Sequence, residues 1–437
     1  MHILYVSQYF PPEMGAPAAR VYELAREWVR MGHRVTVITG FPNHPTGVVP
    51  PEYRGRWFQR EDRDGIEVVR TWLYAAPNKG TTRRILNYLS FPLTAVCLGV
   101  PAVRSCDVVI GTSPQLLVGL AGCAAGMLLR RPFVFEVRDL WPDGIEAVEA
   151  IRSRSVLKAL RFVEEFLYRR AAKIVAVTYS TPRILVSRGF DEAKMAVVPN
   201  GVDLELFERG SRDNEVRRRY APSDRFVVSY IGTHGMAHAL EQVLDAAESL
   251  KSEGGYRFLL VGEGAEKDRL EARARERGLS NVTFVGQQPR ELIPAFYQAS
   301  DACLVPLKDI PLHKAVLPSK MFEIMGVARP ILLCAAGEAR ELMEEAGAGL
   351  AVDPEAPEQL VAAIRKLGED ADLCRRLGEQ GRTFVEASFS RSALARKYAA
   401  ILENVVAAWR RPLRSPSSVA ADAKAPFEAE KRPEPWR

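Results

Sequence analysis

The sequence lacks the cysteine pairs that mark disulfide-rich or zinc-binding proteins. Among its 437 residues there are six cysteines, scattered without a C-x-x-C pair and with mostly apolar neighbours: Cys97, Cys106, Cys123, Cys303, Cys334 and Cys374. This pattern excludes a small secreted domain held by disulfides and a cysteine-ligated zinc centre. We expect reduced core cysteines in a cytoplasmic protein.

The sequence also lacks a strong excess of either charge. Sixty Lys and Arg residues against 54 Asp and Glu residues give a net charge of +6, which is too small to indicate a nucleic-acid partner. The first residues, M-H-I-L-Y-V-S, lack the basic leader and long apolar region of a signal peptide, and we expect them to form a buried strand. With 47% hydrophobic and 26% charged residues, the chain has the composition of a soluble globular protein of two or three domains.

Short apolar, β-branched runs alternate with helical patterns along most of the chain. The predicted strands are 3–6, 35–39, 108–111, 133–137, 174–178, 227–232, 258–262, 282–286, 302–306 and 331–334. This alternation predicts an α/β fold with parallel sheets covered by helices on both faces. We expect two Rossmann-like domains facing across a cleft.

The predicted domain limits follow from the gap between the two series of strands. The first domain covers 1–208 and the second 209–388, and a helix at 389–411 crosses back to the first domain. A disordered tail follows at 412–437, where prolines and charges replace periodicity. Ligands of such sheets bind beyond the carboxyl ends of the strands, so the loops that follow strands are the candidate sites.

The most informative of these loops lies between the strand at 302–306 and a helix that begins at P-S-K-M-F-E. The start of a helix offers unpaired N–H groups and a partial positive charge to a phosphate. Ser319 is a typical residue of a first helical turn, and Lys320 adds a full positive charge. Glu323 lies on the same face of the helix, where its oxygens can accept hydrogen bonds from a ribose diol. The spacing also fits an exposed Lys–Glu pair.

Glycines open three further loops after predicted strands. Gly15 and Ala16 follow the first strand and allow a phosphate to approach the next helix, although an ordinary strand-to-helix turn has the same pattern. In the second domain Gly232 and His234 lie in Y-I-G-T-H-G-M, where His234 either contacts a phosphate or base or is merely exposed. Gly262 follows the next strand.

The Gly262 loop, V-G-E-G-A-E-K-D-R-L, half matches the G-x-G-x-x-G fingerprint of dinucleotide-binding proteins. Lys267 stands at the position of the third glycine, so an NAD enzyme is disfavoured.

Two acidic stretches are further candidate sites. Asp62 and Asp64 form a D-x-D pattern within a charged run that resembles a surface turn, so the sequence predicts no metal site there. The strand at 133–137 ends in E-V-R-D-L-W-P-D, in which Arg138, Asp139 and Asp143 would face the cleft. Asp139 can orient an acceptor hydroxyl there, or it can form an ion pair with Arg138.

An ordered series of motifs carries a resemblance to a known family. The motifs are P-P-E-M-G, V-V-P-N-G-V-D-L-E-L-F, V-G-E-G-A-E-K-D-R-L, N-V-T-F-V-G-Q-Q-P-R-E-L and P-S-K-M-F-E-I-M-G-V-A-R-P-I-L, over about residues 1 to 405. The chain resembles the retaining GT-B glycosyltransferases of sequence family 4. R-D-L-W-P-D and V-L-P-S-K-M-F-E carry a narrower likeness to bacterial fucosamine and N-acetylquinovosamine transferases of surface-polysaccharide (O-antigen) biosynthesis.

This resemblance implies the transfer of a hexosyl or N-acetylhexosaminyl group, here an N-acetylated deoxyhexose, from UDP to a polyprenyl-diphosphate-linked saccharide. Lys320 and Glu323 would bind the donor, and Asp139 would orient the acceptor. The family's first donor-site glutamate is replaced by Ala315, so backbone groups of Lys314, Val316 and Leu317 would contact the sugar instead. We expect no metal and no other cofactor. The alternatives are another sugar-nucleotide enzyme (an epimerase or a glucan synthase) or a nucleotide-sugar-binding scaffold without catalysis.

Two segments of the first domain predict peripheral attachment to the inner face of the cell membrane. Residues 85–103 are apolar and flanked by Arg83, Arg84 and Arg104, and their two prolines argue against a membrane span. Residues 152–173 form a basic amphipathic helix that would add attraction to anionic lipid. The alternative is that both segments are covered by protein.

Overall fold

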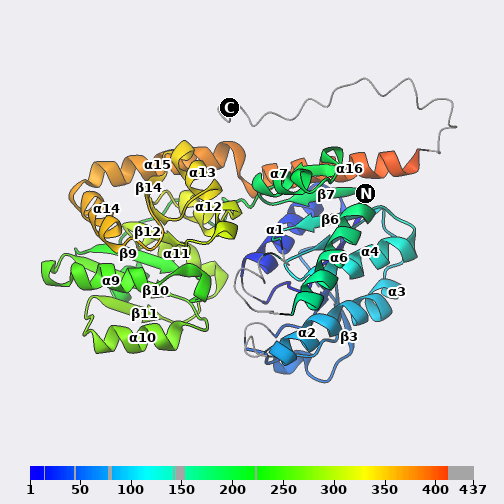
Figure 1. Ribbon diagram of the computed structural model, residues 1–437, viewed down its shortest axis with the longest axis horizontal. Coiled ribbons are helices and arrows are strands. Elements are labelled where there is room, and N and C mark those ends of the chain that lie inside the picture. Colours follow the sequence, from blue (N-terminus) through cyan, green and yellow to red (C-terminus); the bar gives the residue numbers. More distant parts are fainter. Residues whose placement is uncertain are drawn as a thin grey trace.

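The computed structural model describes residues 1–13, 15–43, 46–76, 81–140, 143, 153–221 and 224–411 and contains two α/β units that lie side by side (Figure 1). The predicted tail at 412–437 and Trp141 lie outside the described residues.

The first unit is built on a sheet of eight strands with the order β3-β4-β2-β1-β5-β6-β7-β8. All neighbouring pairs are parallel except β3 and β4, which form an antiparallel hairpin at one edge. The strands are β1 His2–Val6, β2 Arg34–Gly40, β3 Phe58–Arg63, β4 Ile66–Thr71, β5 Val108–Thr112, β6 Phe133–Val137, β7 Lys173–Ala176 and β8 Met195–Val197. The described helices are α1 Ala16–Arg30, α2 Thr81–Thr94, α3 Val100–Ala102, α4 Leu116–Leu129, α6 Arg154–Arg170 and α7 Ser180–Ser187.

The second unit has six parallel strands with the order β11-β10-β9-β12-β13-β14. These are β9 Phe226–Ile231, β10 Tyr256–Val261, β11 Val282–Val285, β12 Ala302–Pro306, β13 Ile331–Cys334 and β14 Gly349–Val352. Its helices are α8 Glu215–Tyr220, α9 Glu241–Ser249, α10 Lys267–Glu276, α11 Ile293–Gln298, α12 Ser319–Gly326, α13 Glu338–Ala346, α14 Pro357–Glu369 and α15 Ala371–Ser388. The strand order reverses between β9 and β12, which is where ligands bind in open parallel sheets.

The helix α16 Arg391–Arg410 returns from the second unit to the first, as predicted (Figure 1). Leu394, Tyr398 and Leu402 lie in the core that also contains β1 and α1. The indole Nε1 of Trp28 donates to the carbonyl oxygen of Ala395 at 3.0 Å. Burial of this apolar stripe holds the end of the chain on the first domain.

All ten predicted strands are present, and four strands were missed: β3, β4, β8 and β14. The sequence of β3 is F-Q-R-E-D-R, and such a polar strand occurs only at the edge of a sheet. The D-x-D pattern spans the end of β3 and the turn after it, since Asp62 belongs to the strand and Asp64 to the turn. Asp62 accepts from the N–H of Gly65 at 3.2 Å, and Asp64 has a φ of 54° and accepts from the hydroxyl of Tyr22 at 2.6 Å. The interpretation of this pattern as a turn is confirmed.

Candidate functional site

Three loops of the second domain meet at the point where its strand order reverses. Gly232 follows β9, Gly262 follows β10, and Lys320 lies in the first turn of α12, after β12. A Cβ on Gly262 would lie 2.0 Å from the carbonyl oxygen of Gly232, and a Cβ on Gly232 would lie 2.7 Å from Nζ of Lys320. Both glycines also have a φ above +140°. Only glycine permits this approach of backbone to backbone.

Lys320 is a buried cation without a hydrogen-bond partner. Its Nζ is shielded from solvent and lies 3.9 Å from the centre of the Tyr230 ring. Burial lowers the pKa of Lys320 to about 7, although Glu323 opposes the shift. The Tyr230 hydroxyl donates to the carbonyl oxygen of Thr233 at 2.6 Å, which fixes the ring below the ammonium group. A buried unpartnered charge is costly, so an incoming anion would stabilise it.

His234 is buried, and neither of its ring nitrogens has a hydrogen-bond partner. The possibility that it is merely an exposed loop residue is therefore wrong. The pKa of His234 is lowered to about 4, mainly by burial and further by the charges of Lys267 and Lys320. The ring is therefore neutral at physiological pH. Lys267 pairs with Glu263 at 2.5 Å. The same positive surroundings that neutralise His234 are suited to an anionic ligand.

The loop before α12 is held by contacts on two sides. A Cβ on Gly337 would lie 2.2 Å from the carbonyl oxygen of Lys314, and the carbonyl oxygen of Leu317 accepts from Nδ2 of Asn200 at 3.4 Å. Val316 continues the loop from the 3₁₀ segment Pro311–Ala315. Helix α12 begins at Ser319 with no side-chain cap and no acidic residue in its first turn. Its first N–H groups are thus available to a ligand.

Glu323 belongs to a series of alternating charges that joins the two domains. Its Oε1 accepts from Arg290 at 2.9 Å, and its Oε2 accepts from the Tyr297 hydroxyl at 3.4 Å. Arg290 also contacts Glu23 of α1 at 2.6 Å, and Glu23 accepts from Nε of Arg391 at 2.8 Å. Burial would lower the pKa of Arg290, but Glu323 and Glu23 raise it above its usual value.

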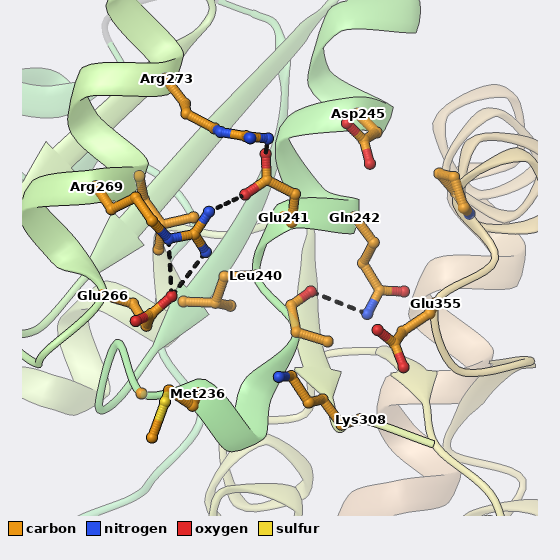
Figure 2. A pocket seen from close by; sticks show the side chains of 14 residues that line it. Met236, Leu240, Glu241, Gln242, Asp245, Glu266, Arg269, Arg273, Lys308 and Glu355 are labelled. Atoms are coloured by element: carbon orange, nitrogen blue, oxygen red, sulfur yellow. Dashed lines mark hydrogen bonds and ion pairs between the residues drawn. The ribbon is translucent and has the colours of Figure 1, made fainter. Parts of the chain in front are cut away.

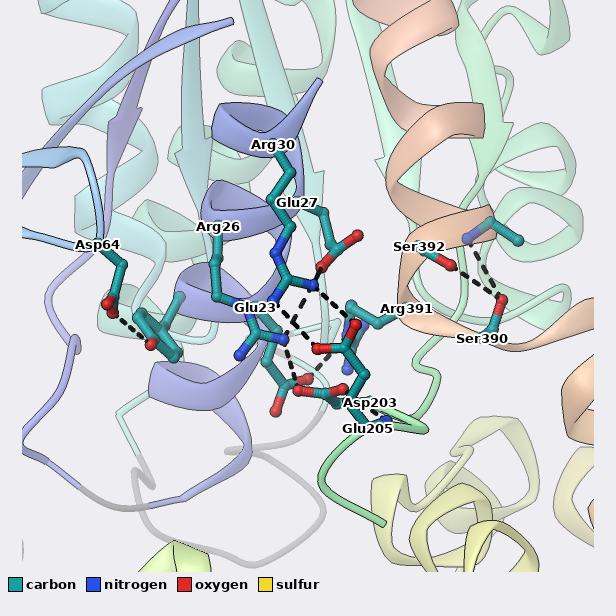
Figure 3. Close-up of polar contacts among 12 residues, drawn as sticks. Glu23, Arg26, Glu27, Arg30, Asp64, Asp203, Glu205, Ser390, Arg391 and Ser392 are labelled. Carbon is teal, nitrogen blue, oxygen red and sulfur yellow. Dashed lines mark hydrogen bonds and ion pairs between the residues drawn. The ribbon is translucent and has the colours of Figure 1, made fainter. Parts of the chain in front are cut away.

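Sequence reasoning missed Arg290 and Glu23. Arg290 lies in the quoted motif N-V-T-F-V-G-Q-Q-P-R-E-L, which was its only signal. Figure 3 shows that Glu23 and Arg391 lie next to an ion pair within the first domain, in which Arg26 of α1 contacts Asp203 at 2.6 Å. A second link between the domains joins Glu338 of α13 to the N–H groups of Tyr179 and Ser180 at the start of α7, both at 2.7 Å.

The first domain presents its own candidate residues at the carboxyl edge of its sheet. Gly15 precedes α1 with a φ of 121° and no side-chain cap, and Ala16 is the first residue of that helix, whose first turn has no acidic residue. Asp139 follows β6, where its N–H and that of Arg138 both point to Oγ of Ser113, at 3.4 and 2.7 Å.

Asp139 is exposed, yet the surrounding protein raises the pKa of its carboxyl, with Arg138 opposing the shift. The described ion pairs include none between Arg138 and Asp139, so the structural pair considered for these residues is not formed. Asp143 instead pairs with Arg188.

Two cavities lie elsewhere in the second domain. One of about 460 Å³ lies at the start of α9 and is lined by Met236, Gln242, Lys308 and charged side chains (Figure 2). It borders the Gly235 loop and the residues Glu266, Arg269 and Leu270 that follow Gly262, but Gly232 and Gly262 do not line it. Its arginines are already paired, Arg269 with Glu241 at 2.8 Å and Arg273 with Glu241 at 2.5 Å. The other, of about 720 Å³, lies at the amino ends of the strands. Neither cavity is lined by Lys320, Glu323 or Asp139. His, Cys, Asp and Glu side chains form no metal-binding group in the described part of the chain.

Comparison with known proteins agrees with this architecture. Residues 211–384 match the family "Glycosyl transferases group 1", and residues 15–201 match the "Glycosyl transferase 4-like domain". The chain is 27% identical over 381 residues to a protein of Escherichia coli K12 provisionally named as the colanic acid biosynthesis glycosyl transferase WcaI, covering 84% of this chain and 92% of that protein.

Two solved structures share the fold. Sucrose-phosphate synthase from Thermosynechococcus elongatus has a TM-score of 0.74 and 21% identity, covering 93% of this chain and 99% of that one. Anabaena Alr3699/HepE in complex with UDP and glucose has a TM-score of 0.69 and 19% identity, covering 92% of this chain and 99% of that one.

Proposed function

We propose that this chain, a glycosyltransferase of the GT-B fold and of the family 4 type, transfers an N-acetylated deoxyhexose from UDP to a polyprenyl-diphosphate-linked saccharide. The reaction would retain the configuration of the sugar and would belong to surface-polysaccharide biosynthesis. The observation that carries the proposal is the buried, unpartnered Nζ of Lys320 beside the glycine loops of β9 and β10. The name of the Escherichia coli relative supports the polysaccharide role, and the UDP complex of the Anabaena protein supports the donor.

In this reaction the bond between the sugar and the donor diphosphate breaks while a bond to an acceptor hydroxyl forms. The barrier lies mainly in the negative charge that develops on the departing diphosphate. Lys320 and the free N–H groups at the start of α12 would stabilise that charge without a metal ion. The uncapped first turn of α1, at Gly15 and Ala16, would line the diphosphate from the first domain.

The remaining candidates would position the two substrates. The two oxygens of Glu323 each have one protein partner, and a carboxylate accepts about four hydrogen bonds, so capacity remains for a ribose diol. Backbone groups between Lys314 and Leu317 would contact the sugar, since Ala315 has no carboxylate. His234 would line the donor as a neutral group, and Asp139 would orient the acceptor hydroxyl.

The deciding experiment is mass spectrometry of the lipid-linked product made from a panel of UDP- and GDP-sugars. A product one N-acetylated deoxyhexose heavier than the acceptor, formed over many turnovers, is expected. A changed sugar nucleotide with unchanged acceptor would indicate an epimerase, and a glucan product would indicate a synthase. Stoichiometric binding without product would indicate a scaffold.

We also propose that the first domain attaches to the cytoplasmic face of the membrane. The segment Ile85–Ala102 is apolar and long enough to span a membrane by composition, with a mean hydropathy of 1.5, and only 28% of it is buried. Leu93 on α2 is 65% exposed and Phe162 on α6 is 72% exposed, and both helices pack against α4. We call this surface the apolar face and define it by exposed residues of the three helices: Ile85, Leu86, Leu89, Leu93, Met127, Leu128, Val156, Phe162 and Phe166.

Basic side chains accompany the apolar face, as a surface for anionic lipid requires. The exposed ones are Arg83, Arg104, Arg130, Arg154, Lys158, Arg161, Arg169 and Arg170. Helix α6 buries Leu157 and Leu167 against the domain and keeps its arginines and phenylalanines outward. The alternative that both predicted segments are covered by protein does not hold for these side chains.

A further inference from the structure

The side chain of Arg138, like that of Lys320, has a buried nitrogen atom without a hydrogen-bond partner. In the described part of the chain, buried nitrogen atoms of five cationic side chains lack a hydrogen-bond partner: Arg26, Arg138, Arg257, Lys320 and Arg391. Three of them hold a partner through another nitrogen, since Arg26 contacts Asp203, Arg257 contacts the carbonyl of Ser280, and Arg391 contacts Glu23. Arg138 and Lys320 hold none.

The position of Arg138 in the first domain parallels that of Lys320 in the second. It is the first residue after β6, at the carboxyl edge of the sheet. The strand order reverses between β1 and β5, and β6 is the neighbour of β5 on the other side. The hydrogen bond from its N–H to Oγ of Ser113 fixes its backbone at this edge. Ligands of parallel sheets bind at such an edge.

The neighbouring carboxylates do not supply the missing partner. Glu136 accepts from the Tyr5 hydroxyl at 2.7 Å, from Oγ of Thr112 at 2.8 Å and from Nη2 of Arg20 at 3.0 Å, so its oxygens are occupied. Asp139 makes no ion pair with Arg138 among the described contacts. Burial and the like charge of Arg20 lower the pKa of Arg138, with Glu136 and Asp139 opposing the shift. In the described part of the chain the guanidinium group thus lies near the like charge of Arg20, and its buried Nη1 has no acceptor.

We propose that Arg138 binds a diphosphate group, so that each domain contributes one cation to the reaction. A guanidinium group offers two parallel N–H donors to phosphate oxygens, which suits it to this ligand better than an ammonium group. The inference rests on the proposed function for the source of the ligand, because both the sugar nucleotide and the lipid-linked acceptor carry a diphosphate.

The test measures dissociation constants by calorimetry for three probes: inorganic pyrophosphate, UDP-N-acetylglucosamine and farnesyl diphosphate. The variants are Arg138→Gln and Arg138→Lys. Arg396→Gln is the charge-matched control, because Arg396 is exposed on α16 and belongs to no proposed site. We expect Arg138→Gln to raise the dissociation constants of pyrophosphate and of one of the other two probes by roughly 10- to 100-fold. Arg138→Lys should raise them by less.

The outcomes separate the two sources and the two proposals. If, besides pyrophosphate, only UDP-N-acetylglucosamine loses affinity, Arg138 is assigned to the donor. If only farnesyl diphosphate does, Arg138 is assigned to the acceptor. Wild-type protein that binds neither would contradict the proposed function, while an Arg138-dependent affinity for pyrophosphate would still support the anion site.

Unchanged affinity of folded Arg138→Gln for all three probes overturns the inference. If Arg138→Gln does not fold, wild-type affinity in Arg138→Lys overturns it, because lysine keeps the charge but loses the two-pronged contact.

Discussion

The two domains share an architecture but differ in their outer surfaces. Of the seventeen exposed large hydrophobic side chains in the described chain, thirteen lie between Val48 and Phe166 in the first domain, and the second domain has two, Met236 and Leu292. The surface of helix α10 of the second domain, K-D-R-L-E-A-R-A-R-E, carries ion pairs instead, such as Arg273 with Glu241 at 2.5 Å. An exposed apolar surface on one domain alone indicates a partner specific to that domain.

At the carboxyl edges of their sheets the domains are more alike. Each presents an uncapped helix start after a glycine or loop, α1 in the first and α12 in the second, and each presents one unpartnered cation. The two domains therefore differ in their outer surfaces, while the proposed reaction would draw on both inner edges. The following changes test that comparison.

Replacement of Lys320 should have the largest effect. Each charge-assisted hydrogen bond to the diphosphate contributes about 1.5 to 3 kcal/mol, so Lys320→Ala should lower kcat/KM by roughly 10- to 150-fold with the fold intact. Lys366→Ala, at an exposed lysine of α14, is the control. Wild-type kinetics in Lys320→Ala would remove the donor site from α12.

Replacement of Glu323 should weaken donor binding by a smaller factor. Glu323→Ala removes the acceptors proposed for the ribose and also leaves Arg290 with Glu23 as its remaining partner in the charge series. We expect about a 10-fold rise in the dissociation constant of UDP, with Glu323→Gln intermediate. If ribose contact is the cause, the loss should be absent for inorganic pyrophosphate. An equal loss for both ligands would indicate that Glu323 acts only through Arg290.

The pH dependence of donor binding should follow Lys320. Its pKa is lowered to about 7, so the empty protein carries the ammonium charge mainly below that pH. The affinity for UDP-N-acetylglucosamine should fall as the pH rises through about 7, by at most 10-fold per pH unit, and Lys320→Met should abolish this slope.

The stability of the empty protein should change in the opposite direction. The unfolded chain, in which the lysine pKa is about 10.4, binds more protons between pH 7 and that value. The contribution of Lys320 to the free energy of unfolding should therefore increase with pH across this window. Thermal unfolding of wild type and Lys320→Met at pH 6 and pH 9 measures it, and an identical difference at both values would contradict the shift.

Charge reversal on the first domain should reduce membrane binding without affecting donor binding. Each basic residue near an anionic surface contributes about 1 kcal/mol, so Arg83→Glu, Arg161→Glu and Arg169→Glu together should abolish flotation with anionic vesicles at low salt. The matched control reverses three exposed charges of the second domain, Arg275, Lys366 and Arg376. If both triple variants reduced flotation equally, membrane binding would not be specific to the first domain.

Removal of divalent metal should have the smallest effect. Lys320 and the start of α12 provide positive charge for the diphosphate, so we expect full activity in EDTA. Activity that is lost in chelator and restored by magnesium or manganese would overturn this prediction. It would also contradict the assignment of Asp62 and Asp64 to a turn alone.

The sequence by itself determined the sheets, the glycine loops and the crossing helix. A strand buried on both faces must be apolar throughout, so β1, β5, β9 and β12 are visible without any tertiary information. Edge strands need not be apolar on both faces, which explains why the polar β3 was missed. The edge strand β14, G-L-A-V, is apolar but has only four residues. The glycines at 232 and 262 were also visible, because backbone approach leaves glycine as the only permitted residue.

Only the tertiary structure decided which charges have partners. Arg290 meets Glu23 across the two domains, and no local period links residues so far apart in the chain. Arg138 and Asp139 are neighbours in sequence and yet form no ion pair among the described contacts, while the buried Glu136 binds Arg20 from a distant helix. Secondary structure follows from local side-chain chemistry, whereas the pairing of a buried charge depends on every element packed around it.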